Sequence, residues 1–131
     1  MKQNTAALLI ALLLTSCIPL NLDFQISTPS KPCFVRTNAV FFLSYYPEQY
    51  PGRAEYSYVS YDGIDWLRKH RKHFLTISKG TVLTVVSQRN EPTAAGTSVI
   101  RFYSLTLQSG QLIRFYHNEQ IGDRKYETPW S

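Results

Sequence analysis

Beyond Pro32 the chain consists mostly of short runs rich in β-branched and aromatic residues, which is the feature that most restricts its possible folds. Such residues favour β-strands, and the Pro, Gly and Asp-Gly positions between the runs favour turns. The runs are 34–43, 55–61, 74–77, 81–86, 98–107 and 112–117. The sequence therefore predicts one mainly β domain over residues 33–131, built as a small antiparallel barrel or sandwich.

The first of two expected hairpins joins residues 74–77 to residues 81–86. The turn between them, Ser78-Lys79-Gly80, contains a glycine, which readily supplies the positive φ of a tight turn. The stretch 78–86 also resembles the middle hairpin of bacterial SH3-like domains, and the resemblance implies an SH3-like barrel.

The second expected hairpin joins residues 98–107 to residues 112–117, and the tetrapeptide Ile-Arg-Phe-Tyr occurs on both arms. A two-residue loop at Ser109-Gly110 would place Tyr103 opposite Tyr116 and Leu107 opposite Leu112.

One short helix is expected within residues 62–73. Asp62 is a suitable N-cap, Ile64 and Leu67 are separated by a helical step, and cations follow at the far end, where they oppose the helix dipole favourably.

The N-terminus has a different character, because residues 6–14 form a continuous apolar run after the basic residue Lys2. A helix of this length rises only about 14 Å, less than the roughly 30 Å of hydrocarbon in a bilayer. A basic start, an apolar centre and small polar residues indicate a secretory signal peptide over residues 1–16.

The sequence Leu14-Thr15-Ser16-Cys17 resembles the lipobox of bacterial lipoproteins. The resemblance implies cleavage before Cys17, a diacylglycerol thioether on its sulfur and an amide-linked acyl chain such as palmitate on its new N-terminus. Ile18, where an inner-membrane lipoprotein of the enterobacterial type has Asp, implies the periplasmic face of the outer membrane. The inner membrane and the cell surface remain alternatives. So does an ordinary signal peptide that leaves Cys17 as a thiol or a disulfide partner.

The predicted mature chain has 115 residues, a formal charge of +4 and Cys33 as its second cysteine. In an oxidising compartment such a cysteine is either buried as a small hydrophobe or available to a partner. Residues 17–32 carry three prolines and no helical periodicity, so they are expected to form a lipid-anchored tether. Alternating apolar residues allow its second half to be a first strand at the edge of the sheet.

The conspicuous candidate site is a run of six consecutive basic residues, comprising Arg68, Lys69, His70, Arg71, Lys72 and His73. The four fixed charges account for the whole excess charge of the mature chain, and they can hold phosphates or carboxylates. The alternative is a solvated face balanced by Glu55, Asp62 and Asp65. The proline-flanked loop with Tyr45, Tyr46 and Tyr50 is a second candidate, because exposed tyrosines offer rigid contact area for sugars or peptides.

Nothing in the sequence indicates catalysis. It contains no Gly-x-Ser-x-Gly, no His-Glu-x-x-His and no phosphate-binding glycine loop. A thiolate pair of Cys33 with His117 lacks the helix start that lowers a cysteine pKa. A metal site of His70, His73 and His117 is disfavoured by the neighbouring cations. We therefore expect no catalytic residue, no metal and no cofactor.

The sequence predicts an envelope lipoprotein that acts as a binding or structural module. The basic segment would contact an anionic envelope polymer or an acidic protein, and nucleic acid is disfavoured in this compartment. An inhibitor or immunity protein directed against a toxin or wall hydrolase, and a small enzyme acting on the cell wall, are the alternatives.

Overall fold

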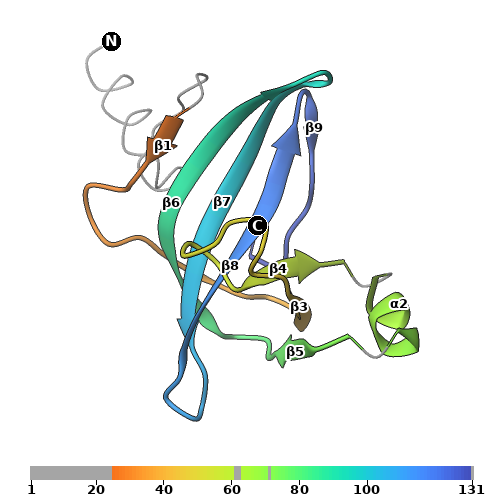
Figure 1. Ribbon diagram of the computed structural model, residues 1–131. Helices are drawn as coiled ribbons and strands as arrows, with labels where there is room; N and C mark the ends of the chain where they lie inside the picture. Colours follow the sequence, from red (N-terminus) through yellow and green to blue (C-terminus); the bar gives the residue numbers. More distant parts are fainter. Residues whose placement is uncertain (1–24, 61–62, 71, 131) are drawn as a thin grey trace.

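The computed structural model of the chain describes residues 25–60, 63–70 and 72–130 (Figure 1). Within them the fold is mainly β with one short helix, as predicted. The strands are β1 Gln25–Ser27, β2 Phe34–Arg36, β3 Phe41–Tyr45, β4 Tyr56–Val59, β5 Phe74–Ile77, β6 Val82–Thr93, β7 Gly96–Thr106, β8 Leu112–Ile121 and β9 Arg124–Lys125, and the helix is α2 Gly63–Lys69. They form one sheet in the order β1-β6-β7-β8-β4-β3-β5, with β2 also on β6 and β9 on β8.

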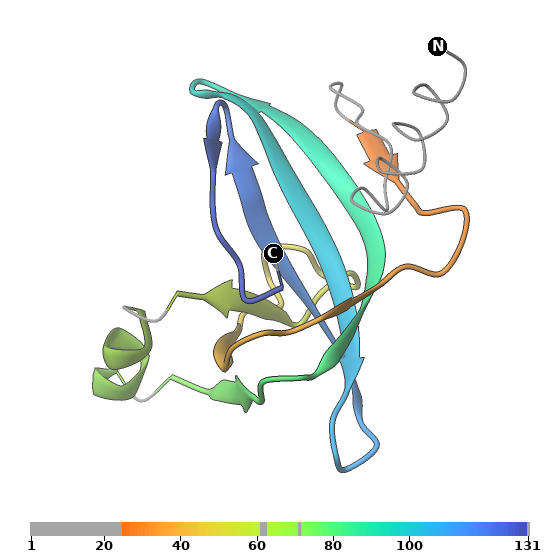
Figure 2. The same ribbon diagram turned by 180° about the vertical axis from the view of Figure 1, so that it is seen from behind.

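The long strands β6, β7 and β8 form an antiparallel meander that runs the length of the molecule (Figure 2). The predicted β7–β8 hairpin is confirmed, but its register is one residue away from the prediction. Tyr103 lies opposite Phe115, and Thr106 lies opposite Leu112. The connection is longer than a two-residue loop, because the N–H of Leu107 donates to the carbonyl of Gln111.

The predicted hairpin between residues 74–77 and 81–86 is wrong. β5 pairs with β3 and the start of β6 pairs with β2, in one common register that spans residues 34–45 and 73–84. The turn at Gly80 does not reverse the chain. It joins β5 to β6 and forms a corner in the ladder, between the β3–β5 pair and the β2–β6 pair. Thr37 lies at the corner, where its N–H donates to the carbonyl of Thr81 and its hydroxyl oxygen accepts from the N–H of Thr81. The stretch 78–86 therefore forms the corner between two strand pairs and not a hairpin of its own.

One strand pair departs from the predicted antiparallel pattern. β4 pairs with β8 in parallel, with Tyr56 opposite Phe115 and Ser57 opposite Tyr116. This pairing joins the small β3–β4–β5 unit to the meander. Together with the bent ladder, it wraps the sheet around the main core.

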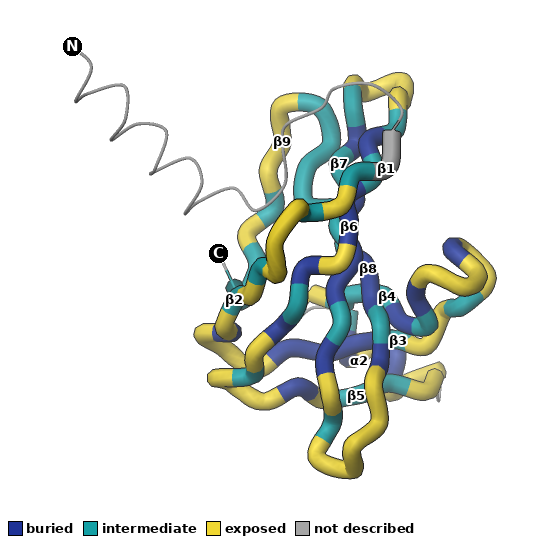
Figure 3. Tube along the Cα trace, turned by 90° about the vertical axis from the view of Figure 1, so that its left-hand side faces the viewer, coloured by how far each residue is buried: buried dark blue, intermediate teal, exposed yellow. Residues whose placement is uncertain are grey.

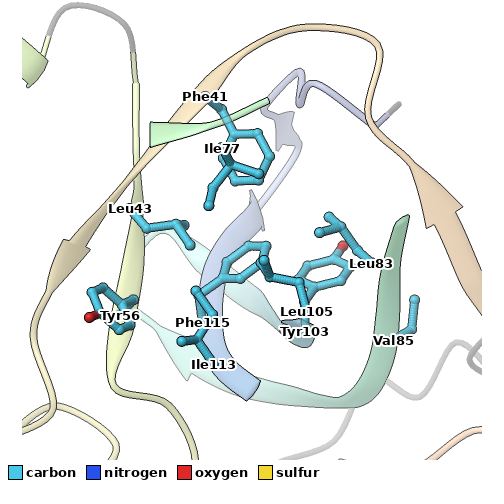
Figure 4. Close-up of a cluster of buried hydrophobic side chains, with 10 residues drawn as sticks. All are labelled: Phe41, Leu43, Tyr56, Ile77, Leu83, Val85, Tyr103, Leu105, Ile113 and Phe115. Carbon is cyan, nitrogen blue, oxygen red and sulfur yellow. The ribbon is translucent and has the colours of Figure 1, made fainter. Parts of the chain in front are cut away.

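The main core lies on the inner side of the bent sheet, and its side chains converge there in Figure 4. It consists of ten buried residues, namely Phe41, Leu43, Tyr56, Ile77, Leu83, Val85, Tyr103, Leu105, Ile113 and Phe115. The meander also buries its opposite face, since neighbours of these residues, such as Phe102 and Tyr116, pack with Tyr50 and Ala54. The loop between β3 and β4 thus covers the outside of the meander.

Burial is greatest in the middle of the strands, and the hairpin ends are exposed (Figure 3).

The helix α2 confirms the helix prediction. It buries Ile64 and Leu67 against Phe42, with Val59 and Phe74 beside them.

β1 lies within the predicted tether and pairs with β6 from Gln25 to Ser27, so the second half of the tether is a strand at the edge of the sheet. The predicted signal peptide and Cys17 lie outside the described residues. Among the residues that the structure describes, no helix is long and apolar enough to cross a membrane.

Candidate functional site

The basic segment begins in the last turn of α2, where Arg68 and Lys69 are exposed. His70, Lys72 and His73 follow and are exposed as well, and Arg71 lies outside the described residues. The buried face of the helix is turned toward Phe42, so the cations lie on its solvent side. The structure therefore places all described members of the predicted basic site on one exposed segment.

Trp66 extends this surface and was not predicted as a site residue. It is 54% exposed, and its ring stacks on His70 with centroids 4.3 Å apart and an interplanar angle of 24°. Nδ1 of His70 lies 2.9 Å from the carbonyl oxygen of Trp66. The i, i+4 spacing of the two rings in the predicted helix was the signal that could have found this pair.

The charge of the segment is only weakly balanced. Arg68 lies 4.0 Å from Asp65, and both side chains are largely exposed. Such exposed pairs contribute well under about 1 kcal/mol. No other ion pair of the basic segment is found among the described residues, so the exposed ammonium groups of Lys69 and Lys72 give the surface a positive field.

The end of the basic segment lies beside the start of the aromatic loop. The N–H of Tyr45 donates to the carbonyl of His73 at 3.1 Å, and the rings of these residues are 6.0 Å apart. The hydroxyl of Tyr56 lies 3.3 Å from Nε2 of His73. Tyr45 and Tyr46 are 51% and 45% exposed. Tyr45 and His73, which lie 28 residues apart in the sequence, therefore bring the two predicted sites together.

The third tyrosine of the predicted loop site was assigned wrongly. Tyr50 is buried, with its ring 4.8 Å from Tyr116 and 5.3 Å from Phe102. Burial raises its pKa above the usual value. It holds the loop on the outer face of the meander, because an apolar sheet face at this position needs a cover. Tyr50 is therefore a core residue and cannot serve as a surface contact.

A second group of polar residues lies on the inner face of the meander, beyond the main core. Arg101 pairs with Glu119 at 3.3 Å and donates to Gln88, which donates in turn to Asn90. Glu119 also accepts from the hydroxyl of Tyr103. Gln88 and Asn90 are buried. This network satisfies polar groups that the sheet buries, and we assign it a structural role.

Trp130 closes the network near the C-terminus. Its Nε1 donates to the hydroxyl of Tyr103 at 2.9 Å and to Glu119 at 3.1 Å. Its ring lies 5.3 Å from Phe41 and 5.7 Å from Phe115, at steep angles. The C-terminal segment is thus held onto the open side of the main core.

The histidines do not come together. The ring of His117 packs against Tyr58, with centroids 4.3 Å apart and the planes tilted by 54°, while His70 lies on Trp66 and His73 beside Tyr56. Burial lowers the pKa of His117 to about 4. Within the described ranges, no three His, Cys, Asp or Glu side chains form a group that could hold a metal ion.

Cys33 is half-buried against the main core and takes part in a disulfide. A sulfur in a disulfide is not a nucleophile, so this form has no Cys33 thiolate to pair with His117. The sequence has one other cysteine, Cys17, outside the described residues. A disulfide and a lipid thioether on Cys17 would both need its sulfur and exclude each other in one molecule.

No protein-family model matches the chain, and neither curated proteins nor solved structures show significant similarity to it.

Proposed function

We propose that this chain is an envelope lipoprotein, attached through Cys17 to the periplasmic face of the outer membrane, that acts as a binding module for an anionic partner. The observation that carries the binding role is the surface formed by Trp66, the basic segment and Tyr45. We call these residues, apart from Arg71, which lies outside the described residues, the α2 surface. It combines exposed aromatic rings with weakly balanced cations.

The rest of the domain fits a binding role. The hydrogen bonds of Tyr103 to Glu119 and Trp130 and the hydrophobic cluster around Tyr50 are internal to the domain and link its segments to the sheet. In contrast, the α2 surface is the solvent side of a helix whose opposite side, Ile64 and Leu67, packs against Phe42. A rigid scaffold with one exposed aromatic and charged element is typical of binding sites.

The binding role is tested by replacing Arg68, Lys69, Arg71 and Lys72 with Ser. If the α2 surface is the site, the variant loses a salt-sensitive association that the native chain forms in envelope extracts, because screened charge pairs carry part of the affinity. Unchanged partners in a pull-down would contradict the proposal. Hydrolysis of purified peptidoglycan by the native chain would favour the enzyme alternative instead.

The anchor is tested by Cys17→Ser. A lipoprotein requires this sulfur, so the variant should not be cleaved after residue 16 and should carry no acyl chain. A variant that is still cleaved and still membrane-bound would refute lipid attachment. Mass spectrometry of the peptide that begins at Cys17 gives a second answer, because a reductant releases a disulfide to Cys33 and leaves a thioether intact.

A further inference from the structure

The solvent side of α2 presents an ordered group of three residues. Trp66, Lys69 and His70 have the spacing i, i+3 and i+4, which places them on one side of a helix. The backbone N–H of His70 still donates to the carbonyl of Trp66 at 3.0 Å, so the helical geometry extends to this residue. The three side chains therefore form one continuous exposed strip.

The geometry of Trp66 favours contact with a protein over insertion into lipid. Its indole lies flat against His70, which covers one ring face and leaves the ring held along the helix. Trp, Tyr and Arg are enriched among the residues that dominate protein interfaces, and an exposed, held tryptophan is therefore typical of such a contact.

The apolar side of α2 is not available to a membrane. Helices that lie in a lipid interface bury their apolar face among the acyl chains. Here Ile64 and Leu67 are 3% and 5% exposed and already pack against Phe42. The helix can therefore offer a lipid surface only its charges and one stacked ring.

The helix α2 and the strand β1, which follows the predicted anchor in the sequence, lie on opposite sides of the domain. β1, which lies within the tether, and β5, which follows α2, occupy the two ends of the sheet order. In Figures 1 and 2 β1 and α2 lie on opposite sides of the meander. A partner on the α2 surface would approach from the side of the domain opposite the tether.

We infer that the partner recognised by the α2 surface is an acidic protein, with Trp66 as the central contact and Lys69 and Lys72 paired with carboxylates around it. This inference rests on the proposed binding role. Charge complementarity selects the acidic partner, and the flat, held indole supplies the apolar centre that a charge pair alone lacks.

The test uses the full-length chain in lipid nanodiscs and follows the fluorescence of Trp66, with Trp66→Phe to identify its signal against that of Trp130. Poly-L-glutamate is the probe for an acidic protein. Anionic lipid is probed by replacing phosphatidylcholine nanodiscs with an equal mixture of phosphatidylcholine and phosphatidylglycerol. We expect poly-L-glutamate to change the emission of Trp66 and the lipid exchange to leave it unchanged.

Two double variants that each remove two positive charges distinguish binding at the α2 surface from non-specific attraction between a basic chain and a polyanion. Lys69→Gln with Lys72→Gln should weaken poly-L-glutamate binding roughly tenfold. Trp66→Ala alone should weaken it by a similar factor, measured by titration calorimetry because this variant lacks the reporting indole. The matched control, Arg124→Gln with Lys125→Gln, removes two exposed cations of β9 and should change binding less than about twofold.

The outcomes separate the inference from the proposed function. A response to anionic lipid without a response to poly-L-glutamate would overturn the acidic protein and leave an anion-binding role standing. Equal weakening by the two double variants would overturn the α2 surface as the site. No response to either probe would count against both the inference and the binding role.

Discussion

His117 lies against Tyr58 with ring centroids 4.3 Å apart, and burial holds its pKa at about 4. Its Nε2 has no hydrogen-bond partner within the described structure. The ring is therefore held neutral in the folded chain, whereas an unfolded chain binds a proton at its usual pKa.

This difference predicts a pH-dependent stability. Above about pH 6.5 the ring is neutral in both states and contributes no pH dependence. As the pH falls from 6.5 to about 4 the unfolded state alone gains a proton, so the free energy of unfolding decreases by up to about 3 kcal/mol. His117→Phe keeps an aromatic ring against Tyr58 but cannot titrate, so it should remove this part of the decrease. Urea unfolding of both chains across this pH range measures it, and identical slopes would contradict the assignment.

The corner of the bent ladder depends on the hydroxyl of Thr37. This oxygen accepts from the N–H of Thr81 at 2.9 Å, and the hydroxyl donates to the carbonyl of Ser78 at 3.2 Å. Thr37→Val leaves the Thr81 N–H without that acceptor and should cost about 1–3 kcal/mol. Thr76→Val, at an exposed strand position, is the control and should change the unfolding free energy by less than about 0.5 kcal/mol. Equal midpoints in urea would rule out this role.

Two glycines with positive φ should respond differently to substitution. A Cβ at Gly122 would lie 2.2 Å from the carbonyl oxygen of Ala95 in the adjacent hairpin, whereas Gly110 has open space around it. Gly110→Ala should cost about 1 kcal/mol from backbone conformation alone. Gly122→Ala adds a backbone clash and should cost at least about 2 kcal/mol more. Comparable thermal midpoints for the two variants would show that the hairpin ends move apart freely.

Substitution of the two tryptophans should lower the free energy of unfolding by different amounts. Trp130→Ala removes ring contacts with Phe41 and Phe115 and the donor to Glu119, so it should cost about 3 kcal/mol. Trp66→Ala removes an exposed ring and should cost less than about 0.5 kcal/mol. Denaturation curves measure both. A large loss at Trp66 would mean that this residue holds α2 in place.

The sequence predicted the features that local pattern determines. The helix 63–69 has its cap signal and apolar spacing, and the β7–β8 hairpin has two arms of β-type residues. The predicted register of this hairpin differs from the observed one by one residue, because the prediction assumed a two-residue loop. The β6–β7 hairpin was missed, since Ala94 and Ala95 lack the Asn-Gly type of turn signal and Pro92 resembles a strand break.

Features that depend on distant pairing could not be predicted. A turn such as the one before Thr81 can reverse a chain or bend it, and here the choice is made by residues 34–45 on the other side of the ladder. The burial of Tyr50 likewise depends on the outer face of the meander. The exposure of residues 68–70, 72 and 73 could be predicted because a run of charge has no place in a core. The exposure of Trp66 was missed because apolar residues on a helix usually face inward.

The short strand β1 would have a mechanical consequence if the domain is anchored and binds a partner as we propose. Among the described residues, β1 holds the edge of β6 through three residue pairs. A pull between the anchor and a partner on α2 would load these pairs first, and residues 25–33 would peel off before the meander gives way. The tether would then lengthen by about 30 Å without loss of the core, so β1 would act as a strain relief between membrane and partner.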